Sequence, residues 1–194
     1  MSYPPLQRRL ELLGIALFPV LAVLGAMRLD GAPLELVAAA LAGWLAADLL
    51  SGLVHWALDE FGSARTPLIG PILIRPFREH HADAAAMTRH DFVETNGAAA
   101  VGGCLLLLLA MALPAGTMHA FLVFTALGVL AANQCHKWAH QQARPRLVRA
   151  AQRVRLIIPP EVHRRHHAAP HDRHYCTASG WLNRPLDFVL RAWR

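Results

Sequence analysis

The sequence predicts an all-α integral membrane protein, with four transmembrane helices and a cytoplasmic, histidine-rich helical cap. Hydrophobic residues make up 55% of the chain and charged residues only 16%, a balance that ordinary soluble domains do not show. Four apolar stretches approach the roughly 20 residues that a helix needs to cross a bilayer. The chain also holds 12 histidines. At 194 residues it fits a single domain, residues 1–194.

The predicted spans cover about residues 10–27, 33–58, 97–113 and 118–135. No convincing small-residue cleavage site follows the first span, so it is interpreted as a retained helix and not as a signal peptide. Pro33 is well placed to begin the second span. Short links make a helical hairpin of the first two spans and another of the last two. They leave a middle loop, residues 59–96, and a tail, residues 136–194.

Lysine and arginine lie almost entirely on one side of the predicted bilayer. Two precede the first span, four lie in the middle loop and twelve follow residue 135, whereas the first link holds one and the second none. The positive-inside rule therefore predicts that both termini, the middle loop and the tail are cytoplasmic, at what we expect to be a bacterial inner membrane. A soluble protein with four buried helices is the alternative, and this asymmetry argues against it.

The basic character of the chain could indicate a nucleic-acid partner, since the net charge is +6 and the pI is near 10.2. However, the basic residues lie between apolar spans, so the expected partner is a membrane with anionic lipid headgroups, and no nucleic acid. The three cysteines form neither a paired framework nor a CxxC motif, which indicates a reducing compartment or simple packing.

Eleven of the twelve histidines fall on the predicted cytoplasmic face. They are His55 at the end of the second span, His80, His81 and His90 in the middle loop, His136 and His140 after the fourth span, and His163, His166, His167, His171 and His174 in the tail. Spacings of three and four recur among them, and a helix places residues so spaced on one face. Neutral imidazole is the commonest protein metal ligand. Because the candidates outnumber the ligands of one ion, two metal ions are expected.

Other polar residues have plainer interpretations. His119, the one histidine on the far side, is interpreted as a polar anchor at the membrane interface. His90, His171 and His174 are as readily solvated residues, or hydrogen-bonding neighbours of ligands, as ligands themselves. Asp48 lies within the second span, where a carboxylate is costly, and is expected to be functional or paired. Four more carboxylates could fix imidazole tautomers by hydrogen bonding: Asp59, which can share a helix face with His55, and Glu79, Asp83 and Asp91.

The position of the histidines separates classes of metal chemistry. A zinc hydrolase would usually carry an H-E-x-x-H helix, which is not present. A membrane cytochrome would place histidines between facing helices inside the hydrocarbon, and a metal transporter would place its ligands near the midplane. Ligands at the rim of apolar helices instead favour O₂ chemistry on the alkyl chain of a lipid, in which the metal removes hydrogen from an unactivated C–H bond.

Five segments of the chain resemble the Kua/CarF family of lipid desaturases, which includes plasmanylethanolamine desaturases. They cover residues 48–59, 75–83, 88–97, 136–140 and 163–183. The resemblance implies eight iron ligands: His55, His80, His81, His136, His140, His163, His166 and His167. His90 and His171 match the plasmanyl-lipid members and are possible further ligands. Ala84 and the pair Thr177-Ala178 depart from the family pattern, but none of these is an implied ligand.

The function that the resemblance implies is formation of the vinyl-ether double bond of plasmalogens from 1-O-alkyl-2-acyl-glycerophosphoethanolamine. It would use two iron ions, O₂ as co-substrate and an external electron donor such as cytochrome b5 or ferredoxin, because nothing in the sequence resembles a flavin or haem domain. The alternatives are a desaturase or hydroxylase of ordinary fatty acyl lipids, and a non-enzymatic metal-binding membrane scaffold.

Two further segments are expected to lie at the membrane surface. Residues 146–158 predict a basic amphipathic helix that Pro159 and Pro160 would end. Its Arg146, Arg149 and Arg153 would anchor the chain to anionic lipid or bind the substrate headgroup. Residues 66–76, with two prolines and a glycine before Pro76, predict a re-entrant or interfacial turn.

Overall fold

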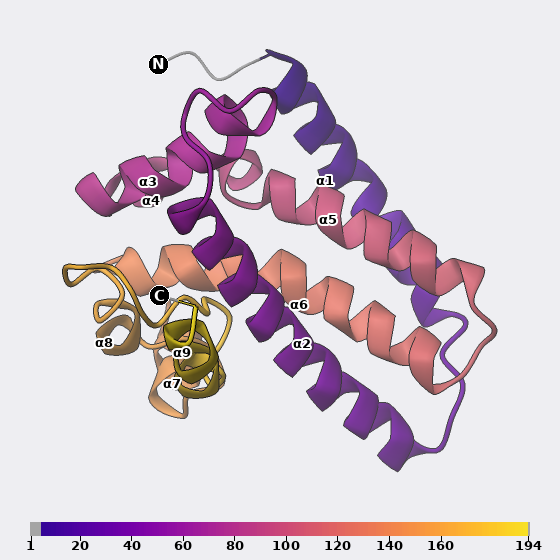
Figure 1. Cartoon of the computed structure of the whole chain (residues 1–194). Helices are drawn as coiled ribbons and strands as arrows, with labels where there is room; N and C mark the ends of the chain where they lie inside the picture. Colours follow the sequence, from indigo (N-terminus) through magenta and orange to yellow (C-terminus); the bar gives the residue numbers. More distant parts are fainter. Residues whose placement is uncertain (1–4, 194) are drawn as a thin grey trace. The chain divides into compact units, whose positions relative to one another are not determined.

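The computed structural model describes residues 5–193, and all regular structure in that part of the chain is helical (Figure 1). The helices are α1 (Pro5–Ala26), α2 (Pro33–Glu60), the π-helix η1 (Gly70–Ile74), α3 (Arg75–Ala82), α4 (Ala86–Arg89), α5 (Phe92–Ala112), α6 (Thr117–His140), α7 (Arg146–Arg153), α8 (Pro160–His163) and α9 (Asn183–Arg191). The predicted all-α fold class is therefore confirmed.

The described residues form two compact units. The first unit contains the chain up to Ala47 together with Asp91–Asn133, and the second contains Asp48–His90 together with the chain from Gln134 onwards. Helices α2 and α6 each contribute to both units. All candidate metal ligands from the sequence lie in the second unit, so the site is described within that unit alone.

Helices α1, α2, α5 and α6 are long and apolar enough to cross a membrane, as the sequence predicts. Their ends differ from the predicted spans because hydropathy detects only the apolar part of a helix. Helix α5 begins at Phe92 and not near residue 97, since Asp91 and Glu94 form a capping box. The Asp91 carboxylate accepts from the Glu94 amide at 2.8 Å, and the Glu94 carboxylate accepts from the Asp91 amide at 3.0 Å. Helix α6 likewise continues to His140.

In the first unit α1 packs along α5, and the two run side by side in Figure 1. Small residues allow this close approach: a methyl group at Gly14 would lie 2.7 Å from Cγ2 of Val101. The core around Phe18 and Leu107 is fully apolar. Large side chains on the opposite face of α1, such as Leu10 and Leu17, are exposed. Such a surface suits contact with lipid acyl chains, whereas water would penalise it.

His119 was interpreted from the sequence as a polar anchor at the membrane interface, and the structure gives it a different environment. It is completely buried in the first unit, with Nδ1 2.9 Å from the carbonyl oxygen of Ala110 and Nε2 2.9 Å from that of Gly25. A neutral ring can donate to one of these two carbonyls, which lie near the ends of α5 and α1, so His119 links the two helices. Arg28 acts similarly, donating to the carbonyls of Met111 and Leu113 at 2.7 and 2.8 Å.

In the second unit the tail packs against the end of α2. Tyr175, Cys176, Leu186 and Leu190 form a buried cluster, and Trp56 of α2 packs against it. The approach is close at Gly52, where a methyl group would lie 2.6 Å from Sγ of Cys176 and 2.7 Å from Cδ2 of Leu186. Gly52 therefore fixes how the tail meets the helix that carries His55.

Replacing Gly52 by alanine is expected to destabilise the protein by about 1–3 kcal/mol, because the added methyl group overpacks this contact. The midpoint of thermal unfolding of the full chain in detergent measures the effect. Gly102→Ala is the matched control, since a methyl group there meets nothing within 4 Å. It should be neutral or slightly stabilising. Equal midpoints for the two variants would contradict the role given to Gly52.

The segment 146–158 is not one amphipathic helix, so that prediction is wrong in its extent. Helix α7 ends at Arg153, and Arg155 follows with a φ of 58°. Ile157 and Ile158 are buried in the second unit and do not share the exposure of Leu147 and Val154. The prediction placed the end of the helix too late because it assumed that the helix continues to Pro159. Residues 66–76 fold into a turn, η1 and the start of α3, and their contact with a membrane stays a prediction.

Candidate metal centre

Helices α2, α3, α6 and α8 and the turn after α8 bring the histidines of the second unit together. His55 and Asp59 lie one turn apart near the end of α2, and His136 and His140 lie one turn apart at the end of α6. Helix α3, which carries His80 and His81, is tied to the end of α2 by Arg78. Its guanidinium donates to the carbonyls of Leu58, Phe61 and Gly62 at 3.2, 3.2 and 3.0 Å.

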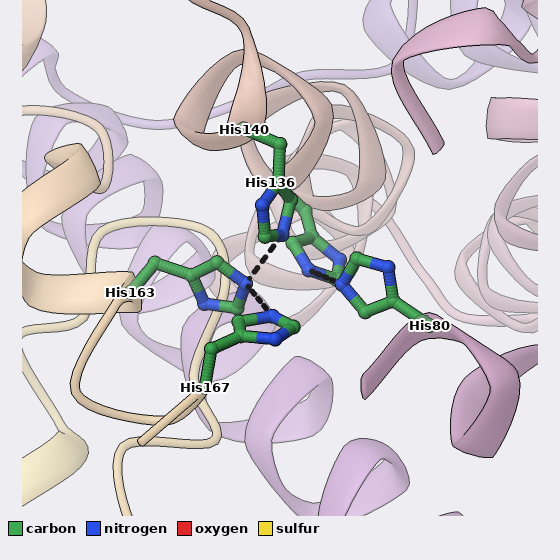
Figure 2. A group of neighbouring side chains, drawn as sticks. All are labelled: His80, His136, His140, His163 and His167. Carbon is green, nitrogen blue, oxygen red and sulfur yellow. Dashed lines mark hydrogen bonds between the residues drawn. The ribbon is translucent and has the colours of Figure 1, made fainter. Parts of the chain in front are cut away.

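The first group of ligand atoms consists only of imidazoles. One ring nitrogen from each of His80, His136, His140, His163 and His167 lies within 4.8 Å of all the others. Figure 2 shows the five rings facing a common centre. Neighbouring Nε2 atoms are 3.0 Å apart between His80 and His136, 2.9 Å between His163 and His140, and 3.1 Å between His167 and His163. A neutral imidazole has only one N–H to donate, so this group presents more lone pairs than its own donors satisfy.

The second group mixes three imidazoles with one carboxylate. Atoms of His55, Asp59, His81 and His166 lie within 4.8 Å of one another. Oδ2 of Asp59 is 3.5 Å from Nε2 of His55, 3.5 Å from that of His81 and 3.6 Å from that of His166. Nε2 of His81 and His166 are 2.8 Å apart. This set of nitrogen and oxygen ligands suits a divalent transition metal such as iron or zinc.

Asp59 gives a direct test of whether a cation fits this group. Its side chain is 8% exposed. Within residues 5–193, neither carboxylate oxygen has a hydrogen-bond partner, and Nε2 of His55 also has none. A buried carboxylate without hydrogen bonds is costly. A cation among these four side chains would satisfy the carboxylate and the imidazole lone pairs together, so the residues fit a metal ion.

Adjacent histidines divide between the two groups. His80 belongs to the first group and His81 to the second, because neighbouring residues on a helix point in different directions. His163 and His167, four apart, share the first group, while His166 joins the second. The expected single helical face for these three does not form, since α8 ends at His163. The two groups are therefore built from shared segments.

Backbone carbonyls orient two of the rings. Nδ1 of His55 lies 3.1 Å from the carbonyl oxygen of Tyr175, and Nδ1 of His166 lies 2.9 Å from that of Arg173. An Nδ1–H that donates to a carbonyl leaves the lone pair on Nε2, which in both rings is the atom in the second group. Tyr175 lies in a segment that resembles the family, residues 163–183, but a contact made through its backbone carbonyl has no signal in the sequence.

Burial holds the histidines outside the membrane spans in their neutral form. Desolvation is the largest cause that lowers the pKa of His81 to about 4 and that of His166 and His167 to about 3, and neighbouring imidazoles contribute to each of these shifts. The pKa values of His80 and His163 are lowered for the same reasons. Because the neutral ring is the metal ligand, these rings are ready to bind metal at neutral pH.

The other carboxylates suggested by the sequence make contacts of their own. Glu79 lies 3.9 Å from the Arg75 guanidinium, and Asp83 pairs with Arg89 at 2.8 Å. Asp91 caps α5 and pairs with Arg8 in the first unit. The contacts that orient the rings come instead from the carbonyls of Tyr175 and Arg173. Asp59, for which the sequence left metal ligation open, supplies an atom of the second group.

The three histidines of uncertain role also lie outside both groups. The ring of His171 stacks on that of His81, with centroids 4.6 Å apart and an interplanar angle of 8°. His90 is exposed, and its carbonyl accepts from Nζ of Lys137 at 2.5 Å. Nε2 of His174 lies 3.9 Å from the Asp187 carboxylate. Arg146, Arg149 and Arg153 are exposed along α7.

Asp48, which was expected to be either functional or paired, is paired with backbone amides of the tail. It is completely buried and accepts backbone hydrogen bonds from Ser179 and Gly180 at 2.7 and 2.9 Å, and from Leu182 at 3.1 Å. These bonds tie the tail to α2, two turns before His55. Asp48 thereby positions the segment whose carbonyls orient the second group.

Replacing Asp48 by alanine is expected to lower the free energy of unfolding by about 3 kcal/mol, because three backbone N–H groups lose their acceptor. Thermal unfolding of the full chain, with metal content measured in parallel, tests this. Asp48→Asn keeps one acceptor oxygen and should fall between the wild type and Asp48→Ala. An alanine variant as stable as the wild type would refute the positioning role.

These features define a helical membrane protein with a buried, histidine-rich site that could bind metal. The lipid desaturase domain profile matches residues 44–194, which include both ligand groups. The chain belongs to the lipid desaturase family and is therefore an oxidoreductase that acts on lipid. The resemblance noted in the sequence is confirmed.

Curated relatives support this assignment. The chain is 44% identical to plasmanylethanolamine desaturase of Myxococcus xanthus over 97% of its own length and 70% of that protein. It is 43% identical to plasmanylethanolamine desaturase 1 of Mus musculus, over 79% of this chain and 60% of the mouse protein. Identity to chloroplastic fatty acid desaturase 4 of Arabidopsis thaliana is 36%, over 79% of this chain and 48% of the plant protein. No solved structure matches the chain.

Proposed function

We propose that this enzyme forms the vinyl-ether double bond of plasmalogens from 1-O-alkyl-2-acyl-glycerophosphoethanolamine. The observation that carries the proposal is the pair of ligand groups, five histidines in one and three histidines with Asp59 in the other. The relatives named as plasmanylethanolamine desaturases supply the substrate, at 44% and 43% identity.

Each ligand group would hold one iron ion. The first would use His80, His136, His140, His163 and His167, and the second His55, Asp59, His81 and His166. When bound, the iron pair supplies the O₂-dependent removal of hydrogen from unactivated carbon. Overall, the alkyl chain loses one hydrogen from each of two adjacent carbons next to the ether oxygen. O₂, two electrons and two protons complete the balance and leave two waters.

The chain's own residues prepare the site in three ways. Burial keeps the imidazoles neutral, so the ligands need not lose protons before they bind metal. The carbonyls of Tyr175 and Arg173 hold two rings with Nε2 turned inward. The buried carboxylate of Asp59 brings a negative charge that offsets part of the charge of the cations. The electrons would come from a separate donor such as cytochrome b5 or ferredoxin.

The same charge asymmetry that orients the spans supports a cytoplasmic metal site, with both termini cytoplasmic, in a bacterial inner membrane. Arg146, Arg149 and Arg153 on α7 would anchor the chain to anionic lipid at that surface. Leu147 and Val154 are 82% and 74% exposed and lie seven residues apart. Beside these arginines, the two side chains would enter the membrane interface.

Expression in cells supplied with alkylglycerol tests the proposal. The expected product is a phosphoethanolamine lipid with an acid-labile vinyl ether, and the purified enzyme should hold about two irons per chain. New double bonds in acyl chains alone would instead favour the acyl-lipid alternative, for which the 36% identity to a fatty acid desaturase is the supporting observation. No lipid change, with the His136→Ala variant behaving like the wild type, would favour a metal-binding scaffold.

A further inference from the structure

A pocket of about 360 Å³ lies in the second unit, separate from the imidazole groups. It is formed by the segment after α7, the turn after α8 and the start of α9. Its lining includes the exposed Arg155, Arg165 and Arg184, and no acidic residue is among the residues that line it. Three guanidinium groups around one concave site strongly favour an anion.

A buried and unpartnered donor lines the same pocket. Asn183 is only 1% exposed. Its Oδ1 accepts from the backbone amide of Cys176 at 2.8 Å, which fixes the orientation of the side-chain amide. Its Nδ2 has no hydrogen-bond partner among the described residues. A buried N–H₂ group without an acceptor is costly, and an oxygen of a bound anion would satisfy it.

The pocket is fixed to the candidate metal centre through the backbone. Arg165 directly precedes His166, and Asp48 holds the amides of Ser179 and Gly180, both of which line the pocket. Nε1 of Trp181 donates to the carbonyl of Arg155 at 2.6 Å, which joins two of its walls. A group bound here would therefore have a defined position relative to the second ligand group.

Apolar side chains near the pocket indicate the source of the anion. Trp181, which lines it, is 45% exposed, and the neighbouring Leu156 is 53% exposed. Helix α9, which begins at Asn183, exposes Phe188 by 80%. Tryptophan and such apolar side chains are typical of a membrane interface. The combination fits a phosphate group that carries apolar chains better than it fits an acidic protein surface.

Resting on the proposed function, we infer that this pocket binds the phosphate of the lipid substrate through Arg155, Arg165, Arg184 and Asn183. With no acidic residue in the lining, it recognises the phosphate and not the ammonium of ethanolamine. The choline analogue of the substrate should therefore bind about as well. The site is distinct from the arginines of α7, none of which lines the pocket.

Lipid binding by the purified full chain in detergent tests the inference without turnover. The probes are 1-O-alkyl-2-acyl-glycerophosphoethanolamine, its choline analogue, and 1-O-alkyl-2-acylglycerol, which has no phosphate. Arg184→Gln and Arg165→Gln should each raise the Kd for the two phospholipids by about tenfold, as expected for loss of one charge-assisted hydrogen bond. The Kd for the phosphate-free lipid should not change.

Arg191→Gln is the matched control, because it removes one exposed arginine from the same helix, α9, outside the pocket. It should leave every Kd unchanged. Asn183→Asp keeps the acceptor for Cys176 but replaces the donor with a charged oxygen, and it should weaken phospholipid binding more than either arginine variant. Circular dichroism confirms that each variant is folded.

Several results would overturn the inference. One is the same phospholipid Kd in the pocket variants and in Arg191→Gln. Another is an equal loss of affinity for the phosphate-free lipid. A pocket that binds inorganic phosphate, with no effect of the variants on lipid, would make free phosphate its ligand and would also refute the inference. Phosphate-dependent binding by a wild type that forms no vinyl ether would reject the proposed reaction but keep the pocket.

Discussion

His140→Ala is expected to reduce desaturation by at least about a hundredfold and to lower the iron content from about two ions per chain to about one. His140 lies in the last turn of α6, and its Nε2 is 2.9 Å from that of His163, within the five-histidine group. Alanine removes this ligand without disturbing the helix, because alanine is the strongest helix former. Metal analysis and product formation, measured on the same preparation, give the two values.

Gln142→Ala is the control for this variant, because Gln142 is exposed just beyond the end of α6. It should retain wild-type iron and activity. Wild-type iron content in His140→Ala would show that His140 is not a ligand. Reduced activity with full iron content would assign it to substrate handling instead.

The architecture was largely predictable from the sequence because its main signals are local. A run of apolar residues long enough to cross a bilayer can be recognised in the sequence without any tertiary information. The same holds for a spacing of four residues, such as that from His136 to His140. Helix ends were less accurate: a capping box at Asp91 extends α5 beyond its apolar part. The end of α7 also escaped prediction, because Arg155 adopts a left-handed conformation that its residue type does not signal.

The division of histidines into two groups could not be read from spacing. It depends on the end of α8 at His163, after which turns carry His166 and His167 to different groups. The backbone contacts that orient the rings could not be predicted either, since the carbonyls of Tyr175 and Arg173 have no signature in the sequence. The environment of His119 was also not predicted, since this residue was interpreted as a polar anchor at the membrane interface. It is fully buried, and its ring lies against one carbonyl near the end of α5 and another near the end of α1.

Asp59 shows most clearly how stability and function oppose each other in this site. Its buried carboxylate has no hydrogen bond to any residue that the structure describes, and its Oδ2 lies 3.5 to 3.6 Å from three imidazole nitrogens. We expect such a group to destabilise the metal-free protein, and a cation bound among these side chains would compensate for it. The carboxylate should therefore raise stability only when metal is bound.

Asp59→Asn is accordingly expected to change stability in opposite directions in the two states. Without metal, the neutral amide removes the buried charge, so the thermal unfolding midpoint should rise or stay the same. With iron, the variant should gain much less stability than the wild type, because stabilisation by a ligand scales with its affinity. Desaturation should fall by about a hundredfold or more, with iron reduced to about one per chain.

Asp83→Asn provides the comparison, since Asp83 is an exposed carboxylate of the same unit that pairs with Arg89 and not with histidine. Its two unfolding midpoints and its iron content should match those of the wild type. A metal-free Asp59→Asn protein that is less stable than the wild type would mean that the carboxylate has a stabilising partner in the fold. In that case Asp59 would be a structural residue, and the second metal ion would have only three histidines to hold it.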